Sequence, residues 1–164
     1  MTEERYHAVQ RWFRARPAAL KLLVGSNRAL SLTVYGVYAA MLLALLLSGD
    51  PRLLRAILVP ALVFAGGTLL RAALNFPRPY EVYHTPALAP KDRKGQSFPS
   101  RHMFSSAVLT VCGLWLWPPA GWLLAAVTLL LAPIRVLTGV HFIRDVAAGI
   151  LLGGLLGWLG FFIL

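Results

Sequence analysis

Two histidines and one aspartate in this sequence have the types and spacing that nucleophilic and acid–base chemistry uses. His141 and Asp145 stand four residues apart in "RVLTGVHFIRD", so a helix would place one side chain above the other. A carboxylate in that position holds an imidazole in one tautomer and raises its basicity. His102, in "FPSRH", supplies a second imidazole that can protonate a departing oxygen.

Four arginines accompany these residues, namely Arg71, Arg78, Arg101 and Arg135. Arg71 and Arg78 are seven positions apart, nearly two helical turns, so they share a face if the helix continues close to Pro77. Ser100 is a good N-cap for a helix that begins at Arg101, and the free N–H groups of such a helix bind an anion. Guanidinium groups bind phosphate oxygens in pairs and repel a divalent cation. The pattern therefore predicts a phosphate site without a metal or other cofactor.

Each of these residues taken alone has a simpler interpretation. Arg71 would be a snorkelling anchor, Ser100 only a cap, and His102 an interfacial hydrogen-bonding residue. The pair of His141 and Asp145 would be structural, and Arg144 is interpreted as an anchor outside the site. The combination is more informative, because ionisable residues that meet inside a membrane bundle are functional as a rule.

The composition places the chain in a membrane. Of its 164 residues, 58% are hydrophobic and 13% are charged, and the mean hydropathy is +0.67. A soluble domain of this size cannot bury so much apolar surface. The net charge of +10 is explained by basic residues that flank membrane spans and bind anionic lipids, so we expect no nucleic-acid partner. The sequence does not indicate an oligomeric state.

The hydropathy pattern predicts an all-α, polytopic transmembrane bundle with about five spans. Charge-free or nearly charge-free runs occupy residues 29–48 and 53–75, and the last span covers about 146–164 with small residues for close helix contact. The charge-free run 103–134 would measure about 48 Å as one helix, too long for one crossing. We therefore expect "WPPAGW" at 117–122 to form a hairpin between the third and fourth spans.

The N-terminal residues 1–28 form a basic amphipathic interfacial segment in this prediction, which Pro17 divides into two short helices. The remaining residues, 29–164, form one transmembrane domain. Six of the 16 basic residues precede the first span, and the positive-inside rule then places the N-terminus and the polar loops in the cytoplasm. We expect a multi-pass protein of a bacterial cytoplasmic membrane, with its site on the cytoplasmic face.

Three short motifs carry a resemblance to a known family. They are Arg71-x6-Arg78-Pro79, Pro99-Ser100-Arg101-His102, and Ile134-Arg135-x5-His141-x3-Asp145. In order and spacing they resemble the motifs Lys-x6-Arg-Pro, Pro-Ser-Gly-His and Ser-Arg-x5-His-x3-Asp of the type-2 phosphatidic acid phosphatase superfamily, which consists of integral membrane lipid phosphatases. The resemblance covers about residues 53–164.

The resemblance implies a mechanism. His141 would attack phosphorus and form a phosphohistidine, Asp145 would orient His141, and His102 would be the general acid toward the leaving group. The phosphoryl oxygens would be bound by Arg71, Arg78, Ser100 and Arg135, with help from the backbone N–H groups of Arg101 and His102.

This chain departs from the family motifs at three positions. Arg71 replaces a lysine, Arg101 a glycine and Ile134 a serine. The nucleophile, its carboxylate and the acid are all retained, so activity is still expected. The Arg101 side chain contacts a second phosphate or the lipid headgroup, or points to water, and we favour contact with the substrate.

The leading hypothesis is a phosphatase that acts on a lipid mono- or diphosphate: phosphatidic acid, phosphatidylglycerophosphate or a polyprenyl diphosphate such as undecaprenyl diphosphate. A lipid phosphotransferase that uses the same phosphohistidine is the alternative. A non-catalytic anionic-lipid binder would not need His141, Asp145 and His102 together, and is therefore less favoured.

Overall fold

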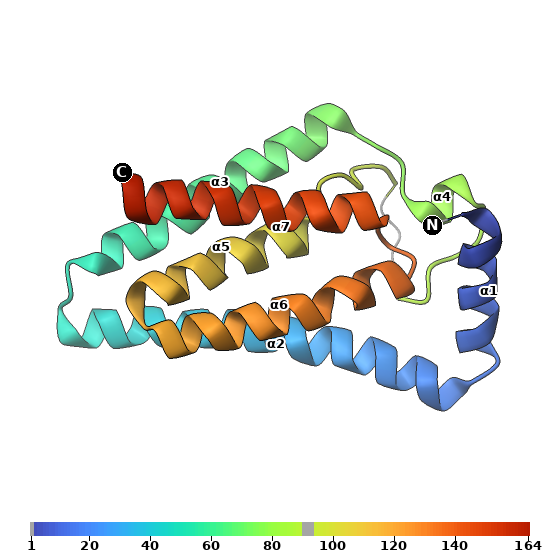
Figure 1. Cartoon of the computed structure of the whole chain (residues 1–164), viewed down its shortest axis with the longest axis horizontal. Helices are drawn as coiled ribbons and strands as arrows, with labels where there is room; N and C mark the ends of the chain where they lie inside the picture. The colour runs from blue at the N-terminus through green and yellow to red at the C-terminus, as the bar shows by residue number, and fades with distance from the viewer. Residues whose placement is uncertain (1, 90–93) are drawn as a thin grey trace.

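The computed structural model describes residues 2–89 and 94–164, and within these residues the chain forms helices and no strands. The helices are α1 (Glu3–Arg14), α2 (Pro17–Ser48), α3 (Arg52–Leu74), α4 (Pro79–Val82), α5 (Arg101–Leu116), α6 (Pro118–Leu137), α7 (Ile143–Trp158) and the π-helical turn η1 (Leu159–Ile163), which extends α7. Five long helices run along the molecule, and α1 crosses one end of them (Figure 1). The predicted all-α membrane bundle is confirmed.

Four stretches among the described residues are long and apolar enough to cross a membrane: Pro17–Ser48, Arg52–Val82, Pro118–Leu137 and Ile143–Ile163. The predicted third span corresponds to α5, which has 16 residues and is therefore about 24 Å long. Helix α5 lies at the centre of the bundle, where α6 and α7 pack against it, and ten of its residues are buried. Its short length is compatible with a position surrounded by protein.

Glycines bring α7 close to α5. Gly149, Gly153 and Gly157 recur at every fourth position of α7 and are buried. A Cβ added to Gly149 would lie 2.8 Å from the Ser100 carbonyl oxygen, and one added to Gly153 would collide with the backbone of Phe104. Close approach between membrane helices requires such small residues. The predicted close contact of the last span is confirmed.

The predicted hairpin between α5 and α6 is also confirmed. Trp117 ends α5 and caps α6, and Pro118 is the first residue of α6. Gly113 and Gly121 then face each other across the turn, since a Cβ on Gly113 would lie 2.9 Å from the backbone of Gly121. Pro is favourable at the first position of a helix because that N–H has no intrahelical partner.

The N-terminal segment contains two helices that Pro17 separates, but the second one is not short. Helix α2 runs unbroken from Pro17 to Ser48, so Lys21 and Arg28 lie on the same helix as the first predicted span. Pro17 stands at the start of α2, where it is tolerated, and nothing between it and residue 29 breaks the helix.

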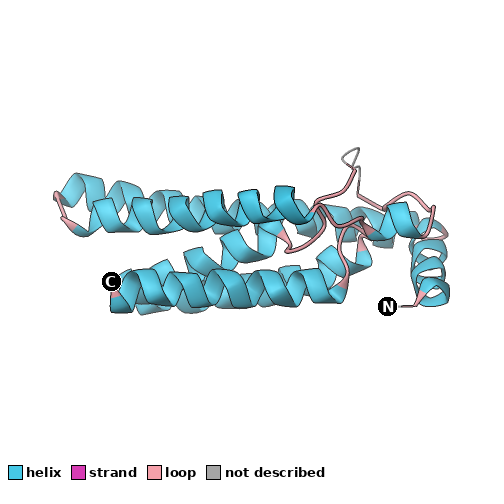
Figure 2. Ribbon diagram, turned by 90° about the horizontal axis from the view of Figure 1, so that it is seen from above, coloured by secondary structure: helices cyan, strands magenta, loops and turns pink. Residues whose placement is uncertain are grey.

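Helix α1 packs with its inner face on the loops at one end of the bundle (Figure 2). Tyr6 Oη donates to the Thr85 carbonyl oxygen at 3.1 Å, and Gln10 Nε2 donates to the Leu137 carbonyl oxygen at 3.4 Å. Gly139, with φ 77°, faces both side chains, and a Cβ there would lie 2.7 Å from Tyr6 Oη. Burial raises the pKa of Tyr6 to about 12, so its hydroxyl remains a donor at neutral pH.

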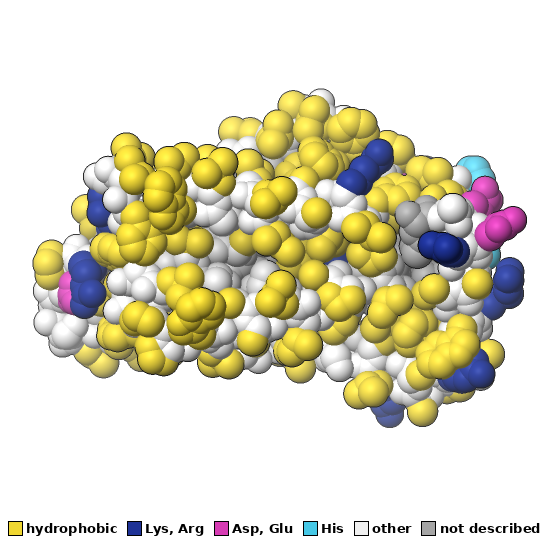
Figure 3. Space-filling view, viewed as in Figure 1, with side chains coloured by type: hydrophobic (Ala, Val, Ile, Leu, Met, Phe, Trp, Pro, Cys, Tyr) yellow, Lys and Arg dark blue, Asp and Glu magenta, His cyan; other side chains and the backbone are white. Residues whose placement is uncertain are grey.

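The outer surface agrees with a lipid environment. Figure 3 shows hydrophobic side chains over the flank of the bundle and most of the visible charged side chains towards its two ends. Leu47, Leu62 and Leu151, for example, are each more than two-thirds exposed. Large apolar side chains are stable at such positions when hydrocarbon replaces water.

Candidate active site

The three polar motifs meet at one end of the bundle, where α3 and α6 end and α5 and α7 begin (Figure 1). They surround a cavity of about 70 Å³. We name it the phosphate cavity, and its lining residues are Thr68, Arg71, Arg78, Lys94, Gly95, Gln96, Arg101, His102 and His141. Five of the eight predicted site residues are among them. The three others, Ser100, Arg135 and Asp145, are buried near it or beside it.

His141 and Asp145 are in contact, although not on one helix as the spacing predicted. His141 lies in the loop before α7, and Asp145 lies in the first turn of α7. The extended backbone of Phe142 starts the helix, and the Asp145 Oδ2 atom accepts from its N–H at 3.0 Å. His141 Nδ1 is 3.6 Å from Asp145 Oδ2. Because Nδ1 faces the carboxylate, the opposite ring nitrogen, Nε2, is the one that can act as a nucleophile.

The His141 ring is uncharged at neutral pH. Burial lowers the pKa of His141 to about 4, and the nearby guanidinium groups of Arg78 and Arg135 act in the same direction. The hydrogen bond and charge of Asp145 oppose this lowering only in part. A neutral imidazole has a free electron pair, which a nucleophile requires.

Arg71 and Arg78 do not share one helix face. Helix α3 ends at Leu74, and Asn75 then has a φ of 42°, so the chain turns before Pro77. Arg78 is the N-cap of α4. Helix α3 matches the predicted span 53–75, but the condition for a shared face, a helix that continues close to Pro77, is not met, since the left-handed Asn75 ends it.

Both guanidinium groups nevertheless reach the loop that precedes α5. Arg71 donates to the carbonyl oxygens of Gln96, Ser97 and Pro99. Arg78 donates from Nε to the Gly95 carbonyl oxygen at 2.9 Å and from Nη2 to that of Gln96 at 3.3 Å. It also donates to the Val140 carbonyl oxygen at 3.2 Å, next to His141. Their charges are thereby fixed at the cavity wall.

Helix α5 begins at Arg101 with Ser100 as its N-cap, as predicted. The Ser100 N–H donates to the Asp145 carbonyl oxygen at 2.8 Å and ties the second motif to the third. Within the part of the chain that the structure describes, the buried Ser100 Oγ has no hydrogen-bond partner. This hydroxyl and the first N–H groups of α5 are donors for an anion.

Arg135 does not line the phosphate cavity. It is buried near the end of α6, and its Nε has no hydrogen-bond partner among residues 2–89 and 94–164. It lines a second cavity, of about 310 Å³, which it shares with His102. Arg144, which sequence reasoning left out, has its Nε 3.6 Å from Asp145 Oδ1 while most of its side chain stays exposed.

Two site residues were missed by sequence reasoning. Ser97 is fully buried, and its Oγ donates to Asp145 Oδ2 at 2.5 Å and lies 3.5 Å from His141 Nδ1. Glu81 accepts from the N–H groups of Arg78 and Gly95, at 2.9 Å each. The position of Glu81, three residues after an N-cap, was a usable signal. Ser97 had none, since its partners are 44 and 48 residues away.

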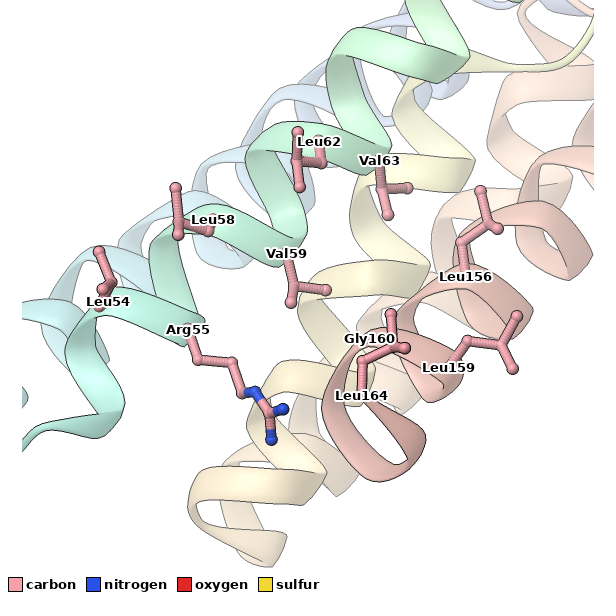
Figure 4. Close-up of a pocket in the computed structure, with 10 residues that line it drawn as sticks. All are labelled: Leu54, Arg55, Leu58, Val59, Leu62, Val63, Leu156, Leu159, Gly160 and Leu164. Carbon is pink, nitrogen blue, oxygen red and sulfur yellow. The ribbon is translucent and has the colours of Figure 1, made fainter.

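No group of three His, Cys, Asp or Glu side chains converges among the described residues. Another cavity, of about 510 Å³, lies between α3 and the end of α7 (Figure 4). Its lining is aliphatic apart from Arg55, and it contains none of the predicted site residues.

Residues 52–163 match the sequence model of the PAP2 superfamily. The chain belongs to the PAP2 superfamily. The match begins at α3, so α1 and α2 precede it. No protein of curated function matches the sequence.

Two solved structures share this PAP2 fold. Aquifex aeolicus LpxE is 21% identical, with a TM-score of 0.65, and the alignment covers 87% of this chain and 92% of LpxE. A PAP2 type phosphatidylglycerolphosphate phosphatase from Bacillus subtilis is 22% identical, with a TM-score of 0.63, and the alignment covers 96% of this chain and 83% of that protein. The chain therefore has the fold of a PAP2 membrane phosphatase.

Proposed function

We propose that this PAP2 protein hydrolyses a lipid phosphate through a phosphohistidine on His141 and without a metal ion. The observation that carries this proposal is that His102 and His141 line one small cavity together with three arginines. Two imidazoles on one phosphate-sized site provide a nucleophile and an acid, and the arginines neutralise the phosphate oxygens.

The reaction has two steps. His141 Nε2 attacks phosphorus, the bond between phosphorus and the leaving oxygen breaks, and His102 gives its proton to that oxygen. Water then attacks the phosphohistidine, loses its proton to His102, and releases inorganic phosphate and neutral His141. Asp145, supported by Ser97, stabilises the charged His141 ring during the first step. Arg71, Arg78, Ser100 and Arg135, with the N–H groups of Arg101 and His102, bind the phosphoryl oxygens.

The surroundings of the site favour a lipid substrate. Tyr35 of α2 lines the second cavity and also an apolar cavity of about 240 Å³ between α2, α3 and α5. Ile57, Pro60 and Phe64 form part of its wall. An acyl or prenyl chain fits this wall because its burial there removes apolar surface from water. Phosphatidic acid, phosphatidylglycerophosphate and polyprenyl diphosphate are the substrates to test.

The test is phosphate release from these lipids by purified protein, with and without EDTA. We expect release that the chelator does not reduce and that the His141→Ala variant lacks. A strong loss with EDTA would contradict the metal-free mechanism. Transfer of labelled phosphate to a second lipid, in place of its release as inorganic phosphate, would indicate the phosphotransferase alternative.

We further propose that the site faces the cytoplasm of a bacterium. In support, α1, with its basic side chains, lies at the same end of the bundle as the phosphate cavity (Figure 2). Cys112 is buried and is the single cysteine, so Cys112→Ala gives a background for a Thr85→Cys probe. The probe should resist a membrane-impermeant thiol reagent in intact cells and react after lysis. Labelling of intact cells would overturn this orientation.

A further inference from the structure

A short loop segment, residues 95–97, connects the arginines of the phosphate cavity to His141 and Asp145. The three N–H groups and the three carbonyl oxygens of this segment are all hydrogen-bonded to residues 71–81. The N–H groups donate to side-chain oxygens of Glu81 and Asn75 and to the Phe76 carbonyl oxygen, and the carbonyl oxygens accept from Arg71 and Arg78. This pairing fixes the position of Ser97, the last residue of the segment.

The Ser97 hydroxyl contacts both His141 and Asp145. Ser97 Oγ donates to Asp145 Oδ2 at 2.5 Å and lies 3.5 Å from His141 Nδ1. The distance from His141 Nδ1 to Asp145 Oδ2 is nearly the same, 3.6 Å. All three residues are buried, so bulk water does not compete for these contacts. The imidazole therefore has two acceptors at Nδ1, the hydroxyl oxygen and the carboxylate.

The direction of these hydrogen bonds selects one tautomer of His141. The single proton of the Ser97 hydroxyl goes to Asp145 Oδ2, so the hydroxyl oxygen presents a lone pair to the imidazole. A lone pair and a carboxylate oxygen both require a proton on Nδ1. Nε2 is then the nitrogen without a proton, which is the form that can attack phosphorus.

We propose that Ser97 is a positioning residue, whose hydroxyl oxygen shares the Nδ1 proton of His141 with Asp145 and so holds Nε2 ready for the phosphate. This inference rests on the proposed function and adds to it a residue that lies outside the three family motifs. Ser97 does not line the phosphate cavity, so it acts through His141 and not on the substrate. Because Arg71 and Arg78 bind the same segment, the position of the nucleophile is tied to that of the phosphate-binding charges.

The test measures kcat and KM for phosphate release from the proposed lipid that the wild-type protein hydrolyses fastest. Ser97→Ala removes the hydroxyl, whereas Ser97→Cys keeps a side chain of similar size whose thiol is only a weak donor and acceptor. Ser106→Ala is the matched control. Ser106 is also buried, its Oγ lies 2.7 Å from Thr128 Oγ1, and it does not line the phosphate cavity.

We expect Ser97→Ala to lower kcat about tenfold to a hundredfold, as loss of one hydrogen bond to a charged group does. KM should stay within about twofold of wild type, because Ser97 does not line the phosphate cavity. Ser97→Cys should lower kcat nearly as much, whereas Ser106→Ala should change it less than about twofold. In an Asp145→Asn background, Ser97→Ala should lower kcat less than about threefold, because residues that act as a unit have non-additive effects.

A Ser97→Cys protein with wild-type kcat would show that Ser97 only fills space, and would overturn the inference. An equally large loss from Ser97→Ala in the Asp145→Asn background, or a loss that appears in KM alone, would also overturn it. The proposed function stands in each of these cases, because the wild-type protein still releases phosphate.

Failure of the wild-type protein to release phosphate from any of the proposed lipids would instead overturn the proposed function, and the inference with it. Thermal unfolding in detergent checks the fold of each variant. If Ser97→Ala does not fold, Ser97→Cys carries the test, because it retains the volume of the buried side chain.

Discussion

The charged side chains at the two ends of the bundle differ in how far they are buried. At the site end, Arg71, Arg78, Arg135 and Asp145 are at least 95% buried. At the other end, Asp50 accepts from Arg52 at 2.7 Å in an exposed ion pair, and Arg52 and Arg55 lie about 6 Å from the ring of Trp115. Burying charge costs several kcal/mol per ion, whereas exposed charge costs little.

This difference in burial indicates which end of the bundle can bind a charged ligand. Among the described residues, the arginines that are shielded from water lie at the site end, where one buried carboxylate, Asp145, does not balance three buried guanidinium groups. In the proposed reaction, an anionic substrate would supply the missing charge. The predictions below test this contrast, from the largest expected effect to the smallest.

Removal of the proposed nucleophile should give the largest effect. His141→Ala should lower kcat by about 10⁴-fold or more, because loss of a nucleophile removes the covalent route. His84→Asn is the matched control, since His84 is exposed and has a φ of 48°, which Asn accepts. Phosphate release measures both. A His141→Ala protein with more than a tenth of wild-type activity would rule out the phosphohistidine.

Removal of one arginine from each end of the bundle should affect kcat/KM only at the site end. Arg71→Ala should lower kcat/KM by about 10²–10³-fold, the usual cost of one preorganised donor to a transition-state oxyanion. Arg71→Lys restores the residue of the family motif and should stay within about tenfold of wild type. Arg52→Ala, at the far end, should leave kcat/KM unchanged. Comparable losses for Arg71→Ala and Arg52→Ala would show that bulk charge matters and the cavity does not.

Packing at the site end depends on Gly153. Gly153→Ala should lower the free energy of unfolding by about 1–3 kcal/mol, because the new methyl meets the Phe104 backbone and cannot be accommodated without a shift. Gly154→Ala is the neighbouring control, with nothing within 4 Å of the new methyl, and should be neutral or slightly stabilising. Denaturation in detergent measures both. Equal free energies of unfolding for the two variants would show that α5 and α7 are less closely packed at Gly153 than described.

The pH dependence of stability should report the buried His141. Its folded pKa, about 4, lies below the ordinary value of 6.5, so the unfolded chain binds more protons between these values. Stability should therefore fall as the pH decreases from about 6.5 to about 4, by at most about 1.4 kcal/mol per pH unit for one proton. His141→Gln should remove this slope, which thermal unfolding at several pH values measures. An unchanged slope in the variant would assign it to another group.

The sequence predicted the features that depend on neighbouring residues. Charge-free lengths located the helices, Pro118 and the flanking tryptophans located the hairpin, and Ser100 located the start of α5. The family motifs nominated eight residues, and the structure brings five of them to one cavity and buries the other three around it.

Features that depend on distant contacts could not be predicted. Ser97 contacts Asp145 across 48 positions, and α1 reaches Thr85 across 79. The end of α3 agrees with the predicted span 53–75, but the left-handed conformation of Asn75, which takes Arg78 off the helix of Arg71, was not predicted. The position of Arg135 beside His102, facing the second cavity, follows from how α6 packs and not from its motif.

The packing of α1 has a consequence for how the protein is made. Its partners include Tyr83, residues 85–86 and residues 137–139, and the carbonyl group that Gln10 binds is synthesised 127 residues after Gln10. The partners of α1 at residues 83–86 precede α6 in the chain, whereas those at 137–139 are made only after most of α6 has been synthesised. The support that Tyr6 and Gln10 give to the loop around Gly139 can therefore form only late in synthesis.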